Sequence, residues 1–472
     1  METSPFPAPS RSLLYHQISV LLLTFFAYAS FHASRKPPSI VKPALAPDPS
    51  SNSTGWPPFD GAGGTHRLGE LDLAFLSAYS AGMYLAGHAA DRLDLRRFLA
   101  IGMLLSGLSC IAFGLGFFWD VHHLLFFIAV QIAGGLVQSI GWPCVVSVVG
   151  NWFGKSRRGL IMGVWNSHTS FGNILGSVMA SSVLEFGWGW SFVIPGLLII
   201  VVGFFVLGFL VVDPRDAGFE FATPVSEVEM SDGVGGAGEK PDLGNVEEVG
   251  LLEEGSKLDS SSAKAIGFVE AWRLPGVAPF AFCLFFSKLV AYTFLYWLPF
   301  YIRHNAVAGL QVSHKTAGML STIFDVGGVL GGISAGFISD RLGARAVTSI
   351  IFLVCSIPAL VIYRMYGNVS MYFNMSLMFL SGYFVNGPYA LITTAVAADL
   401  GTQDSIKGNS RALATVAAII DGTGSVGAAL GPLLTGYIST RGWNSVFLML
   451  VLATSLAIMF LIRIAKAELQ TK

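Results

Sequence analysis

Charged side chains are scarce along this chain of 472 residues, and their scarcity excludes an ordinary soluble domain. Asp, Glu, Lys and Arg make up 12% of the sequence and hydrophobic residues 53%, whereas soluble domains carry about 25% charged residues. About twelve apolar stretches of roughly 18–28 residues are each long enough for a helix across about 30 Å of hydrocarbon. A transmembrane β-barrel would show shorter segments of alternating polarity. The composition therefore predicts an all-α, multi-pass membrane protein.

Cysteine is also rare, and the four cysteines show neither the spacing of a metal site nor that of a disulfide framework. We interpret them as small, buried, apolar side chains. No nucleophile elbow or phosphate-cradling glycine loop falls on a soluble domain, so we predict no enzyme activity, no cofactor or metal, and no nucleic-acid partner. The first apolar run is too long for a signal-peptide core and lacks a cleavage site, so we expect it to remain. The cysteines are Cys110, Cys144, Cys283 and Cys355.

The apolar stretches form two groups of six, separated by an acidic segment that is rich in Gly and Ser and poor in aromatic residues. Such a segment buries too little surface to fold. We predict an N-terminal half over residues 1–212, a flexible linker over 213–270 and a C-terminal half over 271–472. The predicted spans are 14–35, 71–90, 98–117, 122–150, 159–183, 188–212, 276–302, 316–338, 346–365, 372–398, 410–438 and 443–464.

The two halves carry a repeated loop motif. GHAADRLDLRR follows the second span and GFISDRLGAR the eighth, and both have the form G-x-x-x-D-R-L. Long internal repeats are typical of secondary transporter folds, so we predict two pseudo-symmetric halves of six helices. We interpret the charged loop residues of the motif as conformational gating residues that do not bind substrate. They are Asp91, Arg92, Asp340 and Arg341.

Basic residues gather in the short loops that follow even-numbered spans, which predicts that these loops, the linker and both termini lie in the cytosol. The first long loop, about residues 37–70, then lies outside. It carries the sequon Asn52-Ser53-Thr54, which is compatible with glycosylation in the plasma membrane or an endomembrane.

Two cations lie within apolar spans, one in each half. Arg35 ends the first span, and Lys288 lies about twelve residues into the seventh. An ionised arginine in hydrocarbon costs roughly 2.5–3.5 kcal/mol, so such a residue usually faces a cavity or an anion. The pair predicts a site for a doubly charged anion such as a phosphate ester. The alternatives are that Arg35 snorkels from its helix end and that Lys288 pairs with a carboxylate.

Tyrosines share a helix face with each cation. Tyr28 precedes Arg35 by seven residues, and Tyr292 and Tyr296 follow Lys288 by four and eight. These spacings place the side chains on one stripe, from which hydroxyl groups can donate to phosphate oxygens.

Other polar side chains within the spans have two interpretations. Gln138 and Asn386 either line the substrate site or form hydrogen bonds between helices. His168 either shares a proton with the substrate, because its ordinary pKa is close to the second pKa of phosphate, or bonds a neighbouring helix.

Two aspartates within the spans, Asp325 and Asp421, would repel a phosphate. We interpret them as ion-pair partners of Lys36 or Lys288 that form in one conformation only, as state-dependent latches.

The paired halves, the central linker and the repeated loop together resemble the major facilitator superfamily. More specific motifs resemble its organophosphate:phosphate antiporter family, which includes bacterial glycerol-3-phosphate transporters and eukaryotic sugar-phosphate exchangers, and the eukaryotic branch fits best. In that family the arginine of the Arg-Lys pair binds phosphate, so the resemblance implies this role for Arg35. The matching motifs are Arg35-Lys36, Gln138-Ser139-Ile140-Gly141-Trp142-Pro143, Arg157-Arg158-Gly159, Val164-Trp165-Asn166 and Trp297-x-Pro299-x-Tyr301.

The resemblance implies exchange of a phosphate monoester for inorganic phosphate by alternating access, carried out by a monomer. One departure concerns the second phosphate-binding arginine of the bacterial proteins: Ala291 stands there, and the cation is Lys288, a point charge about one turn away. The alternatives are a cation-coupled symporter of a sugar or an organic anion, with Asp325 or Asp421 as its acid, a non-transporting receptor or scaffold, and a membrane enzyme.

Overall fold

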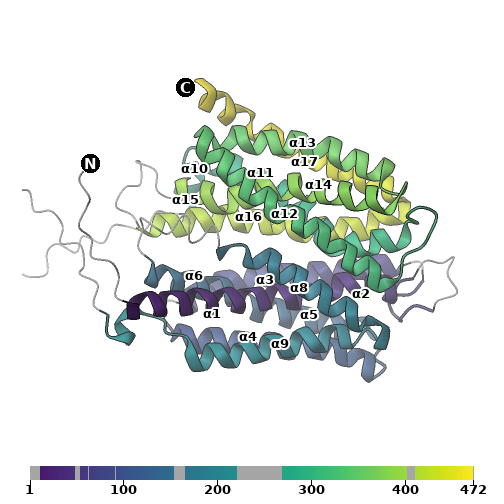
Figure 1. The fold of residues 1–472 in the computed structure, drawn as a ribbon, viewed down its shortest axis with the longest axis horizontal. Helices are drawn as coiled ribbons and strands as arrows, with labels where there is room; N and C mark the ends of the chain where they lie inside the picture. Colours follow the sequence, from purple (N-terminus) through teal and green to yellow (C-terminus); the bar gives the residue numbers. More distant parts are fainter. Residues whose placement is uncertain are drawn as a thin grey trace, which may run out of the picture.

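The computed structural model describes residues 11–47, 54–61, 63–90, 92–153, 165–219, 268–400 and 410–470. These residues are helical apart from their connections, with one isolated β-bridge between Val307 and Leu310. Nine helical segments among them are long and apolar enough to cross a membrane. Three further helices, α3 (Gly64–Ala90), α8 (His168–Val183) and α14 (Met371–Leu391), lie in the same bundle (Figure 1). The all-α membrane fold predicted from the apolar runs is confirmed.

Two stacked layers of helices make up the molecule (Figure 1). The lower layer, coloured purple to teal, holds the N-terminal helices, and the upper layer, green to yellow, holds the C-terminal ones. The start of α1 (Arg11–Arg35) and the end of α17 (Trp443–Gln470) lie toward the left of this view. The remaining lower helices are α1 (Arg11–Arg35), α2 (Pro37–Leu45), α4 (Leu95–Phe118), α5 (Leu124–Gln138), α6 (Gly141–Trp152) and α9 (Trp190–Phe209).

Among the described residues, the upper layer contains six long helices and two short ones. Residues 220–267 of the predicted linker lie outside the described residues, so the boundaries of the two halves stay predictions. The remaining upper helices are α10 (Phe268–Arg273), α11 (Val277–His304), α12 (His314–Leu342), α13 (Arg345–Tyr366), α15 (Ala397–Leu400), α16 (Ser410–Ile438) and α17 (Trp443–Gln470).

The helices break at three points along the predicted spans. The first span ends at Arg35, and a separate helix, α2, starts at Pro37; prolines are tolerated in its first turn because the first N–H groups of a helix have no partner within it. The fourth is divided at Ser139 and Ile140 into α5 and α6. The tenth ends in a π-helical turn, Ile392–Val396, before α15. Two of the residues expected to bind substrate, Arg35 and Gln138, lie at the first two of these breaks.

The two layers pack against each other through α3 and α16, α8 and α12, and α2 and α11. Glycines permit this approach at the end of the bundle opposite the chain termini. A Cβ added at Gly69 of α3 would lie 3.1 Å from the carbonyl oxygen of Leu433, and one at Gly318 of α12 would clash with Ser181 Oγ. We call this end, where α2 also lies, the closed end.

Candidate functional site

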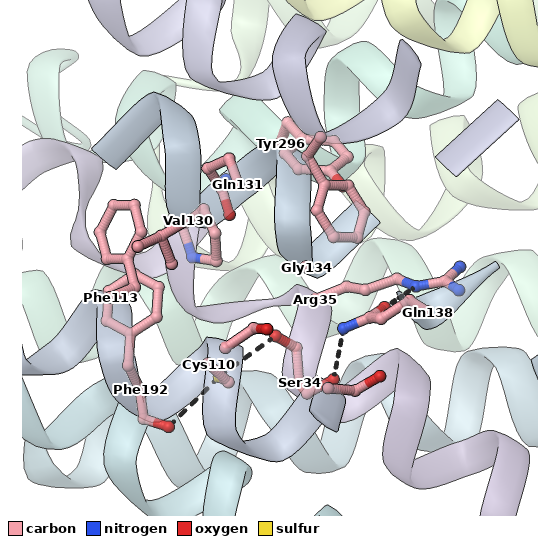
Figure 2. A pocket seen from close by; sticks show the side chains of 14 residues that line it. Ser34, Arg35, Cys110, Phe113, Val130, Gln131, Gly134, Gln138, Phe192 and Tyr296 are labelled. Atoms are coloured by element: carbon pink, nitrogen blue, oxygen red, sulfur yellow. Dashed lines mark hydrogen bonds between the residues drawn. The ribbon is translucent and has the colours of Figure 1, made fainter. Parts of the chain in front are cut away.

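Arg35 lies at the last residue of α1, where the chain breaks before α2. Its Nε donates a hydrogen bond of 2.7 Å to Gln138 Oε1, and Gln138 Nε2 donates one of 3.0 Å to Ser34 Oγ (Figure 2). The guanidinium carbon lies 4.5 Å from the ring centroid of Tyr79. These partners fix the direction of the arginine, and all of them are neutral.

One end of the Arg35 guanidinium remains available to a ligand. Nη2 is buried and has no hydrogen-bond partner among the described residues. No carboxylate of that part of the chain lies within ion-pair distance of the arginine. A buried charged donor without a partner is costly, and an anion that fills this position removes the cost.

A cavity adjoins Arg35 within the N-terminal layer (Figure 2). It lies among α1, α3, α4, α5 and α9, and Tyr296 of α11 also lines it, so both layers contribute to its wall. The polar residues of its lining are Ser34, Arg35, Ser106, Ser109, Gln131, Gln138 and Tyr296.

Five tyrosines surround the two predicted cations. The hydroxyl oxygens of Tyr28 and Tyr79 are 3.3 Å apart in the N-terminal layer. In the C-terminal layer the ring centroid of Tyr292 lies 6.3 Å from that of Tyr296 and 6.4 Å from that of Tyr389. Of these five, Tyr79 and Tyr389 were not predicted, because no spacing links them to either cation.

Lys288 differs from Arg35 in having a carboxylate partner. Its Nζ lies 2.7 Å from Asp421 Oδ1 of α16 and 5.7 Å from the ring centroid of Tyr389. The lysine side chain is 4% exposed and the aspartate 34%, so the carboxylate is the more accessible member. Of the alternatives left open by the sequence, this structure has the ion pair, and it assigns Asp421 to Lys288.

A second ion pair joins the two layers. Lys36, directly after Arg35, places its Nζ 3.3 Å from Asp325 Oδ2 of α12, and both side chains are buried. Because the partners belong to different layers, separation of α1 from α12 would break this pair.

His168 begins α8 inside an aromatic enclosure and is fully buried. Its ring centroid lies 4.3 Å from that of Trp165, 4.7 Å from that of Tyr28 and 6.1 Å from that of His32. Its Nδ1 contacts Thr169 Oγ1 at 3.2 Å, and its Nε2 has no partner within the described part of the chain. His168 therefore packs beside Tyr28, behind the arginine.

Asn386 lies apart from these groups. Its Nδ2 donates to the Gly382 carbonyl oxygen within α14, and the side chain packs against Gly328 of α12. These contacts place it at the α12–α14 interface, but its hydrogen bond stays within α14 and does not join two helices.

The predicted loop residues lie away from the cavity. Arg92 and Arg341 are exposed, and Asp340 accepts a hydrogen bond from Arg345. Asp91 and the sequon residue Asn52 lie outside the described residues.

Comparison with known proteins places the chain among transporters. A family model described as Major Facilitator Superfamily matches residues 20–405 and 280–472. "Putative glycerol-3-phosphate transporter 5" of Arabidopsis thaliana is 68% identical over 98% of this chain and 94% of its own length. "Glucose-6-phosphate exchanger SLC37A2" of Bos taurus is 47% identical over 97% of this chain and 95% of its own length.

A solved structure shares the fold at much lower identity. It is a bacterial homologue of the human lysosomal transporter Spinster, in an inward-facing and unoccupied conformation. Its TM-score is 0.64 at 15% identity, over 96% of this chain and 98% of that one. The fold and its central cations thus define a membrane transporter of two helical layers. The chain belongs to the major facilitator superfamily and, within it, to the organophosphate:phosphate antiporter family.

Proposed function

We propose that this protein is a secondary active antiporter that exchanges a phosphate monoester, glycerol-3-phosphate or a sugar phosphate, for inorganic phosphate by alternating access. The names of its relatives support this substrate class. Within the chain itself, the observation that carries the proposal is the unpartnered Nη2 of Arg35 among neutral groups.

Arg35 is the proposed primary phosphate ligand. A guanidinium presents its donors in a planar fork that fits phosphate oxygens, and it stays charged at every physiological pH. Gln138 accepts from Nε and fixes the guanidinium, which leaves the neighbouring donor, the buried Nη2, for the substrate. The hydroxyl groups of Tyr28 and Tyr79 lie on the same layer and supply further neutral donors.

Lys288 is the proposed second ligand, in competition with Asp421. Without substrate, Asp421 neutralises the charge of Lys288, so that Arg35 and Lys288 do not act as two uncompensated cations in one site. A phosphate dianion that binds Arg35 competes with the exposed Asp421 carboxylate for the lysine. This exchange of partners draws α11 toward α1 and couples binding to movement of the halves. A protein without substrate keeps its ion pairs and changes access state slowly, which enforces exchange.

The packing of the two layers supports an inward-open assignment for this conformation. The layers meet at the end opposite the chain termini, through α3 and α16 and through α2 and α11. With both termini in the cytosol, as the loop charges predict, the outer end is closed. We take the monomer as the working unit.

The ion pairs also weigh against the symporter alternative. A symporter coupled to protons needs an acid free to titrate at the centre. Asp325 and Asp421, its two candidates, are each paired with a lysine.

Counterflow in proteoliposomes tests the proposal. Radiolabelled phosphate should enter vesicles preloaded with phosphate, glycerol-3-phosphate or glucose-6-phosphate, and should not enter empty vesicles. Arg35→Ala should abolish this uptake, while Arg97→Ala, at an exposed arginine, should leave it unchanged. Equal uptake into empty and loaded vesicles would instead favour a symporter or uniporter.

A further inference from the structure

A third ion pair, in which both side chains are buried, lies at the closed end. Lys42 of α2 places its Nζ 2.8 Å from Asp72 Oδ1 of α3, and both side chains are 1% exposed. Both residues belong to the N-terminal layer. The pair is therefore as well shielded from solvent as any ion pair in the described part of the chain. Neither residue belongs to the proposed phosphate site.

Aromatic rings from the other layer cover this pair. Lys42 Nζ lies 5.2 Å from the ring centroid of Tyr296 and 5.1 Å from that of Trp297, both on α11. A cation held against aromatic faces gains electrostatic attraction, and more so where water is excluded. Tyr296 also lines the cavity at Arg35, so its ring links this cover to the substrate site.

Tyr296 and Trp297 cover the Lys42–Asp72 pair only while the two layers are in contact at the closed end. Next to Asp72 on α3, the Glu70 carboxylate accepts a hydrogen bond of 2.8 Å from the Tyr437 hydroxyl of α16. The His66 ring stacks on Tyr437 with centroids 4.3 Å apart. If the layers separate here, α11 withdraws and water reaches the Lys42–Asp72 pair, while the pair itself stays intact because both partners move with one layer.

We propose that the Lys42–Asp72 pair, covered by Tyr296 and Trp297, sets the balance between the two access states of the transporter. Unlike Lys36–Asp325, this pair does not bridge the layers. Its effect comes from the difference between its dry environment in the closed state and its hydrated environment in the open state.

The charge left at Lys42 and Asp72 after a substitution determines whether the closed or the open state is favoured. An intact ion pair tolerates burial because each charge compensates the other, whereas a lone charge left in the same place strongly opposes burial. An apolar pair of similar volume is buried without a desolvation cost, and such replacements are often neutral or stabilising. Single and double substitutions should therefore act in opposite directions on closure.

A distance measurement across the closed end tests this. Spin labels are placed at Phe186 and Leu310, which are 75% and 72% exposed in connections on the two layers, after replacement of the native cysteines by alanine. Lys42→Met should shift the ratio of closed to open distances toward open by about 100-fold. Lys42→Met/Asp72→Leu should restore the closed distance. Arg215→Met, which breaks an exposed pair with Asp213, is the matched control and should change nothing.

A second variant covers the case in which the lone carboxylate prevents folding. Trp297→Leu keeps both charges and removes part of their cover, so it should also shift the distances toward open. The proposal is overturned if both Lys42→Met and Trp297→Leu keep the closed distance, or if the double variant is as open as Lys42→Met. The readout is a distance in the absence of substrate, so it does not depend on the proposed function.

Discussion

Each layer places one cation beside tyrosine rings, yet the two cations differ in their other surroundings. Arg35 is held by neutral groups and keeps a free buried donor. Lys288 is compensated by Asp421 at 2.7 Å. Each half thus contributes one positive charge, but in a different chemical setting. In the proposed mechanism, one half would hold an anion at a cation without a counter-charge, and the other would offer a cation for which the anion competes with a carboxylate.

The largest effect is expected from removal of the charge that has no carboxylate partner in the described part of the chain, that of Arg35. Hydrogen bonds to charged groups contribute about 1.5–3 kcal/mol each, so loss of two should lower kcat/KM for phosphate exchange by at least about 100-fold in Arg35→Ala. Arg35→Lys keeps the charge and loses the fork, and should still lower it by about 10-fold or more. Counterflow in proteoliposomes measures both. Normal transport by Arg35→Lys would contradict the bidentate role.

The ion pair between the layers should have the next largest effect. Asp325→Asn leaves Lys36 buried at 3% exposure without its counter-charge, a change that typically costs about 3–5 kcal/mol. We expect exchange to fall by about 50-fold or more. The swapped variant Lys36→Asp/Asp325→Lys restores the pair and should recover part of the activity. Intact exchange by Asp325→Asn would exclude a latch role.

Much of this architecture could be predicted from the sequence. The spans followed from length and apolarity alone, because a helix in hydrocarbon must satisfy its own backbone. Arg35 and Lys288 stood out because charges are rare in such spans. The choice between Asp325 and Asp421 as the partner of Lys288 depended on how distant helices pack, and no local pattern carries that information.

Other features gave no signal in one sequence. Residues 37–70 were predicted as an outer loop, yet residues 37–45 form α2, which brings Lys42 under α11. Its partner Asp72 stands near the start of a span, where a carboxylate is ordinarily interpreted as facing water. Tyr79 and Tyr389 have no neighbour in the sequence that identifies them. Such contacts arise only from the tertiary packing of α2, α3, α11 and α14.

Removal of the carboxylate partner of Lys288 would leave both cations without a counter-charge and so test whether Asp421 causes the difference between them. Asp421→Asn removes the carboxylate that competes with phosphate, so phosphate should bind about 10-fold more tightly while exchange slows, because release is impeded. Binding calorimetry and counterflow on the same preparation separate the two effects. Lys288→Ala/Asp421→Ala, without either charge, should lose the gain in affinity. Weaker binding by Asp421→Asn would mean that the carboxylate contributes to the site directly.

The smallest expected effect concerns the aromatic rings beneath the two cations. The ring centroid of Tyr79 lies 4.5 Å from the Arg35 guanidinium carbon, and that of Tyr389 lies 5.7 Å from Lys288 Nζ. A cation–π contact contributes about 0.5–2 kcal/mol, so Tyr79→Leu should raise KM by several-fold, whereas Tyr79→Phe, which keeps the ring, should change it less. Tyr389→Leu is the matched substitution in the other layer. Its effect should be smaller still, because Asp421 already holds the lysine and the ring adds little to its position. If both leucine variants raise KM equally, the carboxylate does not distinguish the two cations in the way proposed, and the asymmetry of the site must come from the shape of the cavity.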